Sequence, residues 1–271
     1  MISKKEVSSI IEKWYKRLGF PEKYNEEFYK LLDEYDISPD IAVEGYSFEE
    51  NDPKYNFFAT LYMCEAMEKK VIAKGLGEDR MRELERGLYG WVVGCCNRKG
   101  ALWTELYGWI RHFLRCAIFR IGRLQYTFYH SSKDIPEFDI AVGDALVGIH
   151  IPGGSKLDIE ECRASLRMLE EFACEKFPEF EFKAFTCNSW LLNDELCKYL
   201  PSESNILKFA SLFTIVRKYE SFDILNFVFD RTVKVDNLKD VTPKNSFAAR
   251  IKDAVLAGDK FYCALGVIPR K

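Results

Sequence analysis

The segment from His150 to Lys156 joins a histidine to a glycine-containing turn, and it is the part of this 271-residue chain best suited to chemistry. A short apolar run typical of a β-strand ends at Pro152, two glycines follow, and an amphipathic helix is predicted from about Asp158. Amides in the first turn of a helix have no partner within the helix, and glycines let the main chain approach a bulky anion. The pattern therefore favours a site for the phosphates of a nucleotide or coenzyme.

This turn supplies the predicted anion-binding groups, which are Ile151, Gly153, Gly154, Ser155 and Lys156. Its backbone amides would contact the phosphates, and the lysine would add a positive charge. The turn contains neither the GxxxxGK[ST] pattern nor the GxGxxG pattern. A plain strand-to-helix turn, with Asp158 as the helix cap, explains the same residues and remains the alternative.

Three side chains at predicted strand ends are candidates for proton transfer. His150 ends the strand predicted over 144–151, and Cys187 and Ser189 stand at the end of the strand predicted over 180–187. Ligands of α/β sheets bind just outside the carboxyl ends of strands, and an imidazole titrates near neutral pH. We predict these three residues as catalytic candidates. A structural histidine and a buried thiol are the alternatives.

A long strand predicted over 117–129 carries candidate substrate-binding residues. Strand alternation places Arg123 and Gln125 on one face and Tyr126 on the other. Polar groups that point into a cleft would orient a substrate, whereas the alternative is the polar face of an edge strand.

Composition and charge exclude several classes of function. The net charge is −3 and no basic run is present, which argues against nucleic acid as a partner. No apolar stretch approaches the length of about 18 residues that spans a bilayer, and the first residues lack the apolar region of a secretory signal. The nine cysteines and three histidines include no CxxC pair. We expect a cytoplasmic protein with reduced thiols, no membrane partner and no metal site.

The periodicity of apolar residues predicts an α+β protein in two domains. Helices are predicted over about 3–18, 22–35, 52–71, 78–98 and 101–114, the last with Leu106 on its apolar face, and they form a helical bundle over 1–115. Residues 116–271 are predicted to form a mixed α/β sheet domain. Its strands are predicted over 117–129, 144–151, 180–187, 206–216, 225–231 and 261–268, with helices over 158–177, 194–199 and 246–256.

Four segments in this order resemble a known family. They are Phe119-Arg-Ile-Gly-Arg-Leu-Gln-Tyr126, Gly148-Ile-His-Ile-Pro-Gly-Gly154, Cys187-Asn-Ser-Trp-Leu-Leu192 and Ser204-Asn-Ile206. The chain is similar to a bacterial family of predicted acyltransferases, in which a helical N-acyltransferase N-terminal domain precedes a GNAT-like C-terminal domain. The resemblance implies that pantetheine lies between two splayed parallel strands and that the loop over 152–157 holds the pyrophosphate.

The resemblance also implies an activity, which is acyl transfer from acetyl-CoA or another acyl-CoA to a small-molecule amine. His150 or a water beside it would take the ammonium proton, and Ser189 or Cys187 would protonate the departing thiolate. The loop departs from the usual acetyltransferase pattern because Pro152 removes one amide donor. A non-catalytic GNAT-like module that binds a ligand or partner, and a cysteine enzyme using Cys187 with His150, are the alternatives. The oligomeric state stays open, with a homodimer among the options.

Overall fold

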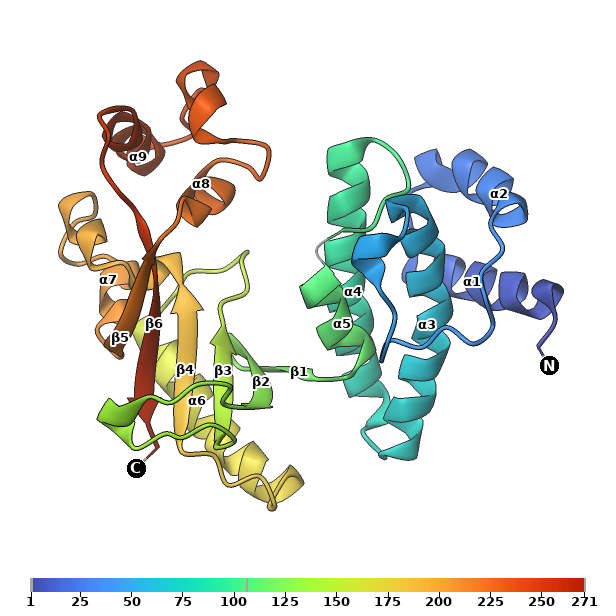
Figure 1. Cartoon of the computed structure of the whole chain (residues 1–271), viewed down its shortest axis with the longest axis horizontal. Coiled ribbons are helices and arrows are strands. Elements are labelled where there is room, and N and C mark those ends of the chain that lie inside the picture. The colour runs from blue at the N-terminus through green and yellow to red at the C-terminus, as the bar shows by residue number, and fades with distance from the viewer. Residues whose placement is uncertain (1, 106, 271) are drawn as a thin grey trace. The chain divides into compact units, whose positions relative to one another are not determined.

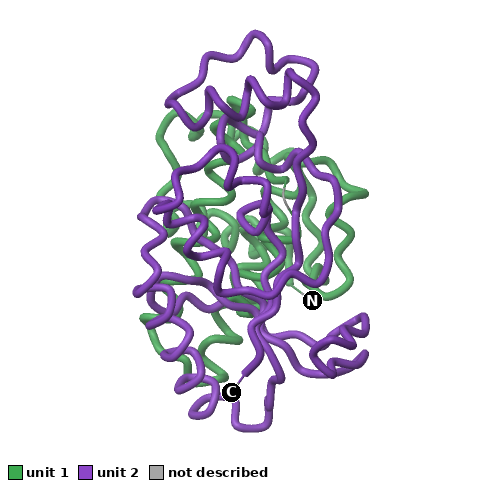
Figure 2. The backbone as a smooth tube through the Cα atoms, turned by 90° about the vertical axis from the view of Figure 1, so that its left-hand side faces the viewer, with its two compact units in different colours: residues 1–118 green, residues 119–271 purple. Residues whose placement is uncertain are grey.

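The structure is a computed structural model that describes residues 2–105 and 107–270. The chain divides into two compact units, residues 1–118 and 119–271, which Figure 2 shows in different colours. Leu106, which the sequence analysis places on the apolar face of the fifth helix, lies outside the described residues. Among the described residues, no helix combines the length and the apolar character needed to cross a bilayer.

The first unit is helical, as the sequence predicts. Its helices are α1 (Lys4–Leu18), α2 (Asn25–Glu34), α3 (Pro53–Ala73), α4 (Gly77–Lys99) and α5 (Tyr107–Leu114), with short 3-10 turns η1 (Glu22–Tyr24) and η2 (Phe48–Glu50). Local chemistry fixes their ends. Ser3 and Glu6 form a capping box at the start of α1, and Gly19 closes α1 with a φ of 71°. Asp52 caps α3 through the amides of Lys54 and Tyr55.

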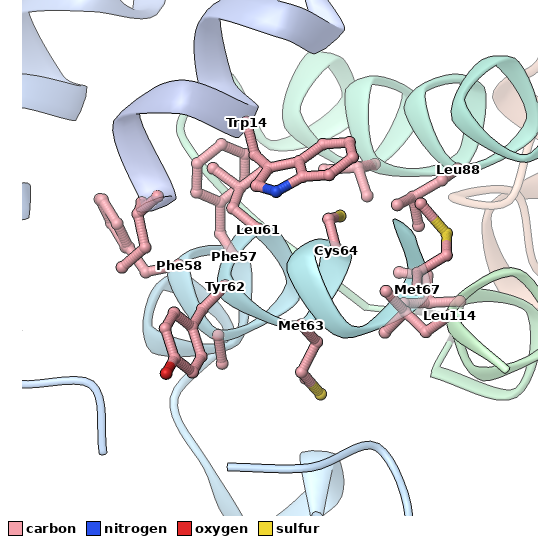
Figure 3. Packing of buried hydrophobic residues seen from close by; sticks show 14 of the residues in the cluster. Trp14, Phe57, Phe58, Leu61, Tyr62, Met63, Cys64, Met67, Leu88 and Leu114 are labelled. Carbon is pink, nitrogen blue, oxygen red and sulfur yellow. The ribbon is translucent and has the colours of Figure 1, made fainter. Parts of the chain in front are cut away.

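Helix α3 forms the centre of the first unit. Its residues from Asn56 to Cys64 are all buried, so it is surrounded on every side rather than along one stripe. Figure 3 shows Trp14 of α1 and Leu88 of α4 packed near Phe57 and Met67 of α3. The high aromatic content of this half therefore fills a core.

The second unit is built on a six-stranded mixed sheet within the described residues (Figure 1). Its strands are β1 (Ile118–Ile121), β2 (Leu124–His130), β3 (Ala145–His150), β4 (Ala184–Ser189), β5 (Thr214–Glu220) and β6 (Tyr262–Pro269). Their order is β1-β2-β3-β4-β6-β5. β3 and β4 are parallel, whereas β2–β3, β4–β6 and β5–β6 are antiparallel. The predicted α+β fold, a helical region followed by a GNAT-like mixed sheet domain, is confirmed.

Helix α6 (Ile159–Lys176) covers one face of this sheet, and further helices and turns belong to the same unit. The further helices are α7 (Asn205–Ala210), α8 (Asp223–Val228) and α9 (Ser246–Leu256), with 3-10 turns η3 (Pro136–Phe138), η4 (Trp190–Leu192), η5 (Asp194–Lys198) and η6 (Val235–Asp240). Cys162 and Leu169 of α6 belong to one buried cluster with Val147, Ile149 and Phe185 of the sheet. That face of β3 and β4 is therefore apolar and closed by α6.

Two predicted strands are wrong. The segments 206–216 and 225–231 contain helices α7 and α8, and β5 begins only at Thr214. Short apolar runs fit either a strand or a buried helix, and the cap decides between them. The side chain of Ser204 accepts a hydrogen bond from the amide of Ile206, which starts α7.

The long strand predicted over 117–129 is also wrong in part, because it is two strands joined by a turn at Gly122 and Arg123. Gly122 has a φ of 59°, a left-handed conformation that glycine adopts without strain. Arg123 consequently leaves the strand alternation that placed it beside Gln125.

Close packing between α4 and α5 gives a stability test in the first unit. A Cβ at Gly87 would lie 2.1 Å from Cε1 of Phe113, whereas a Cβ at Gly90 in the same helix would meet no atom within 4 Å. Both changes to alanine gain helix propensity, but only Gly87→Ala overpacks the core. We expect its free energy of unfolding, measured by denaturant titration, to fall about 1–3 kcal/mol below that of Gly90→Ala. Equal values would contradict this packing.

Candidate active site

The two parallel strands at the middle of the sheet separate toward their carboxyl ends. Their registered pairs join Leu146 to Ala184, Val147 to Phe185, and Gly148 to Thr186. β3 then runs on to His150 and β4 to Ser189, and no registered β3–β4 pair is found in this fully described stretch. Backbone groups on the facing edges are thus available to an extended chain laid between the strands.

His150 lies at the carboxyl end of β3, where the strands separate, and it is half-buried. Its Nε2 is 3.0 Å from Oγ1 of Thr127 on β2. A Cβ at Gly148 would lie 2.7 Å from that Oγ1 and 3.7 Å from Nε2. Glycine at position 148 therefore leaves the room in which the histidine and threonine meet.

Other polar side chains share the face of His150. The hydroxyl of Tyr129 on β2 lies 2.7 Å from Oγ1 of Thr186 on β4, and the hydroxyl of Tyr219 on β5 donates to Oδ1 of Asn188 at 3.1 Å. Burial raises the pKa of both tyrosines, so both hydroxyls keep their protons at neutral pH. A polar row thus crosses the sheet opposite α6.

Sequence reasoning missed this row. The alternation of Gln125, Thr127 and Tyr129 along β2 was a signal for it, but it was obscured by treating residues 117–129 as one strand. Gln125 pairs with His150 in the backbone register. Of the three predicted substrate-binding residues, it is the one on this face.

Cys187 and Ser189 lie on the other face of β4. They alternate with Thr186 and Asn188, and Cys187 is 1% exposed within the cluster that packs on α6. Burial raises the pKa of the Cys187 thiol to about 12. The hydroxyl of Ser189 accepts a hydrogen bond from the amide of Leu191 and so caps η4. The sheet therefore separates these two side chains from His150.

The glycine loop between β3 and α6 is open to solvent from Gly153 to Lys156. A Cβ at Gly153 or Gly154 would meet no atom within 4 Å, so the loop has room for a bulky anion. The start of α6 is different, because Asp158 accepts hydrogen bonds from the amides of Glu160 and Glu161 at 2.9 and 3.1 Å. Those helix amides already have a partner, so an incoming anion would be bound by the loop.

Arg123 reaches this loop from the β1–β2 turn. It is 6% exposed, and its guanidinium donates to the carbonyl oxygens of Pro152, Ser155 and Lys156 at 2.9, 3.0 and 2.6 Å. Burial lowers its pKa from the usual value, although an arginine stays charged at neutral pH. Tyr126 is fully buried. Both residues were predicted to bind substrate. In the structure Arg123 contacts the loop and Tyr126 lies in the core.

A separate cavity lies at the opposite end of β3. It has a volume of about 320 Å³, and Asp144, Glu179 and Glu181 contribute to its lining. These carboxylates would repel phosphates, so the cavity does not suit a coenzyme diphosphate.

Comparisons with known proteins agree with this architecture. Residues 118–268 match the family described as the GNAT-like C-terminal domain. A crystal structure of an acyltransferase in complex with decanoyl-CoA superposes with a TM-score of 0.68 at 25% identity, over 80% of this chain and 66% of that chain. An acyltransferase in complex with decanoyl-CoA and teicoplanin gives a TM-score of 0.68 at 22% identity, over 79% and 66%. The match thus spans just under two thirds of those chains. No curated protein matches the sequence.

The burial of Cys187 predicts a specific order of thiol labelling. Only the thiolate reacts with iodoacetamide, and burial raises the pKa of the Cys187 thiol, so very little of it is ionised at pH 8. We expect the exposed Cys174 and Cys197 to be labelled first, and Cys187 only in denaturant, as read by peptide mass spectrometry. If Cys187 in the folded protein were labelled as fast as Cys174, the result would contradict the structure. It would favour the alternative of a cysteine enzyme that uses Cys187 with His150.

Proposed function

Because the chain belongs to the family of GNAT-like C-terminal domains, we propose that it transfers an acyl group from an acyl-CoA to an amine. The separation of β3 and β4 beyond Gly148 carries this proposal. A pantetheine arm has amide groups along its length, and it can bond to the backbone edges that the two strands leave unpaired there. The neighbouring acyltransferase with decanoyl-CoA supports the same class of co-substrate.

The coenzyme diphosphate would lie on the loop over 152–157, which follows His150 in the chain. The exposed amides of this loop donate hydrogen bonds, and Lys156 adds a positive charge at the exposed surface. Asp158 carries a negative charge at the start of α6 and directs the diphosphate to the glycines rather than to the helix.

His150 would act as the general base. The imidazole of His150, which Thr127 contacts through its hydroxyl, removes a proton from the acceptor ammonium. The amine nitrogen then attacks the thioester carbon, the C–N bond forms, and the C–S bond breaks. The departing thiolate takes up the second proton, which the nitrogen loses as the amide forms, and the imidazolium of His150 releases the first proton to solvent.

The acceptor would be a small molecule with an amine. The polar row of Tyr129, Thr186, Asn188 and Tyr219 offers hydroxyl and amide groups beside His150 for its polar parts. An acyltransferase of similar fold binds teicoplanin together with decanoyl-CoA, which supports a small-molecule acceptor for this chain as well.

The test combines coenzyme binding with turnover. Calorimetry with acetyl-, octanoyl- and decanoyl-CoA should give saturable binding to the wild type, and release of the CoA thiol should depend on an added amine. His150→Gln removes the base but leaves the loop intact. We expect it to bind acyl-CoA with unchanged affinity while turnover falls by about 10²–10⁴-fold.

His130→Gln is the matched control, because His130 lies exposed at the opposite end of the β2–β3 pair. It should retain wild-type binding and turnover. Absence of acyl-CoA binding by the wild type at millimolar concentration would refute the proposed function. Equal turnover by the His150→Gln and His130→Gln variants would instead remove His150 from the mechanism.

A further inference from the structure

One guanidinium binds both ends of the glycine loop. Arg123 donates from Nη1 to the carbonyl of Pro152 at the start of the loop, and from Nη2 and Nε to the carbonyls of Ser155 and Lys156 near its end. Side-chain hydrogen bonds from a charged donor are among the strong ones in proteins. The loop over 152–157 is thus fixed at three points by a residue about thirty positions earlier in the chain.

These three contacts set the direction of three amides. The peptide bonds are trans, and in a trans peptide the C=O and the following N–H point in opposite directions. Because the carbonyls of Pro152, Ser155 and Lys156 face the guanidinium, the N–H groups of Gly153, Lys156 and Leu157 point away from it. The loop therefore turns its acceptors inward and keeps donors for an anion outside.

The turn that carries Arg123 is itself fixed to α6. Ser165 of α6 is fully buried; its hydroxyl donates to the carbonyl of Ile121 and accepts from the amide of Leu124. Its oxygen lies 2.7 Å from the hydroxyl of Tyr126, which must be the donor because serine has a single hydroxyl hydrogen. A Cβ at Gly122 would lie 3.3 Å from the Cβ of Ser165. The turn is thereby held close to the helix that follows the loop.

The positive charge of Arg123 also favours an anion at the loop. Its three acceptors are neutral carbonyl oxygens, so these contacts do not cancel the positive charge beneath the loop. A buried charge is screened less than one in water and attracts an anion on the other side of the loop.

We infer that Arg123 is a positioning residue, which holds the loop over 152–157 in the conformation that receives the coenzyme diphosphate. The inference rests on the proposed function, and it replaces the direct contact with substrate that the sequence suggested for Arg123. Without the guanidinium, the carbonyls of Pro152 and Ser155 are free to turn toward the phosphates and repel them. Part of the binding free energy of the coenzyme would then be lost in ordering the loop.

The test compares two ligands that differ in the diphosphate, decanoyl-CoA and decanoyl-pantetheine. For Arg123→Met we expect the calorimetric Kd of decanoyl-CoA to rise at least about tenfold and that of decanoyl-pantetheine to stay within about twofold. Steady-state kinetics should show a higher KM for decanoyl-CoA with little change in kcat. Arg123→Lys keeps the charge but not the fork of donors, and it should restore part of the affinity.

Arg167→Met is the control, because it removes one positive charge from an exposed position of α6. It should leave both Kd values unchanged. If thermal denaturation shows that Arg123→Met is unfolded, Arg123→Lys serves instead. Its Kd for decanoyl-CoA should rise more than its Kd for decanoyl-pantetheine. Equal affinity of wild type and Arg123 variants for decanoyl-CoA, or equal losses for both ligands, would overturn the inference. Failure of the wild type to bind decanoyl-CoA would instead refute the proposed function, and this inference with it.

Discussion

A buried guanidinium surrounded by backbone carbonyls is the interaction on which the candidate site depends. Burying a charge is costly unless hydrogen bonds compensate, and Arg123 obtains them from Pro152, Ser155 and Lys156. In return, a loop with two exposed glycines acquires a defined shape. The connection between β3 and α6 is therefore more than a turn, because Arg123 orients three of its carbonyls toward the guanidinium.

The second constraint is the difference between the two faces of the sheet. One face packs on α6 and is apolar, and it buries Cys187, which raises the pKa of the thiol. On the other face, the hydroxyl of Thr127 contacts His150, and the hydroxyls of Tyr129 and Thr186 contact each other. β3 and β4 contribute to both faces and separate beyond Gly148, so polar side chains and unpaired backbone edges occur at one place. The proposed transfer from an acyl-CoA to an amine uses both features.

The sequence predicted those features that local chemistry determines. Capping at Ser3 and Asp52 predicted α1 and α3, and the strand ending at His150 and the helix after Asp158 were also found. The same local information was insufficient near Ser204, where a short apolar run forms a helix rather than a strand.

The contacts of the site depend on long-range packing, which explains why the sequence did not predict them. Gly122 was visible inside the predicted strand, but its turn depends on contact with Ser165, some forty residues later. Periodicity carries no information about such a contact, so Arg123 was assigned to a strand face. The resemblance to a family identified the two segments that meet at the loop, whereas only the structure gives the hydrogen bonds between them.

The most direct measurement is the change in backbone amide chemical shifts when CoA is added to ¹⁵N-labelled protein. If the loop presents its donors to the diphosphate, the amides of Gly153, Lys156 and Leu157 should shift most. The amides of Glu160 and Glu161, which donate to Asp158, should shift little. Large shifts at Glu160 and Glu161 with none in the loop would place the phosphates at the helix start and contradict this account.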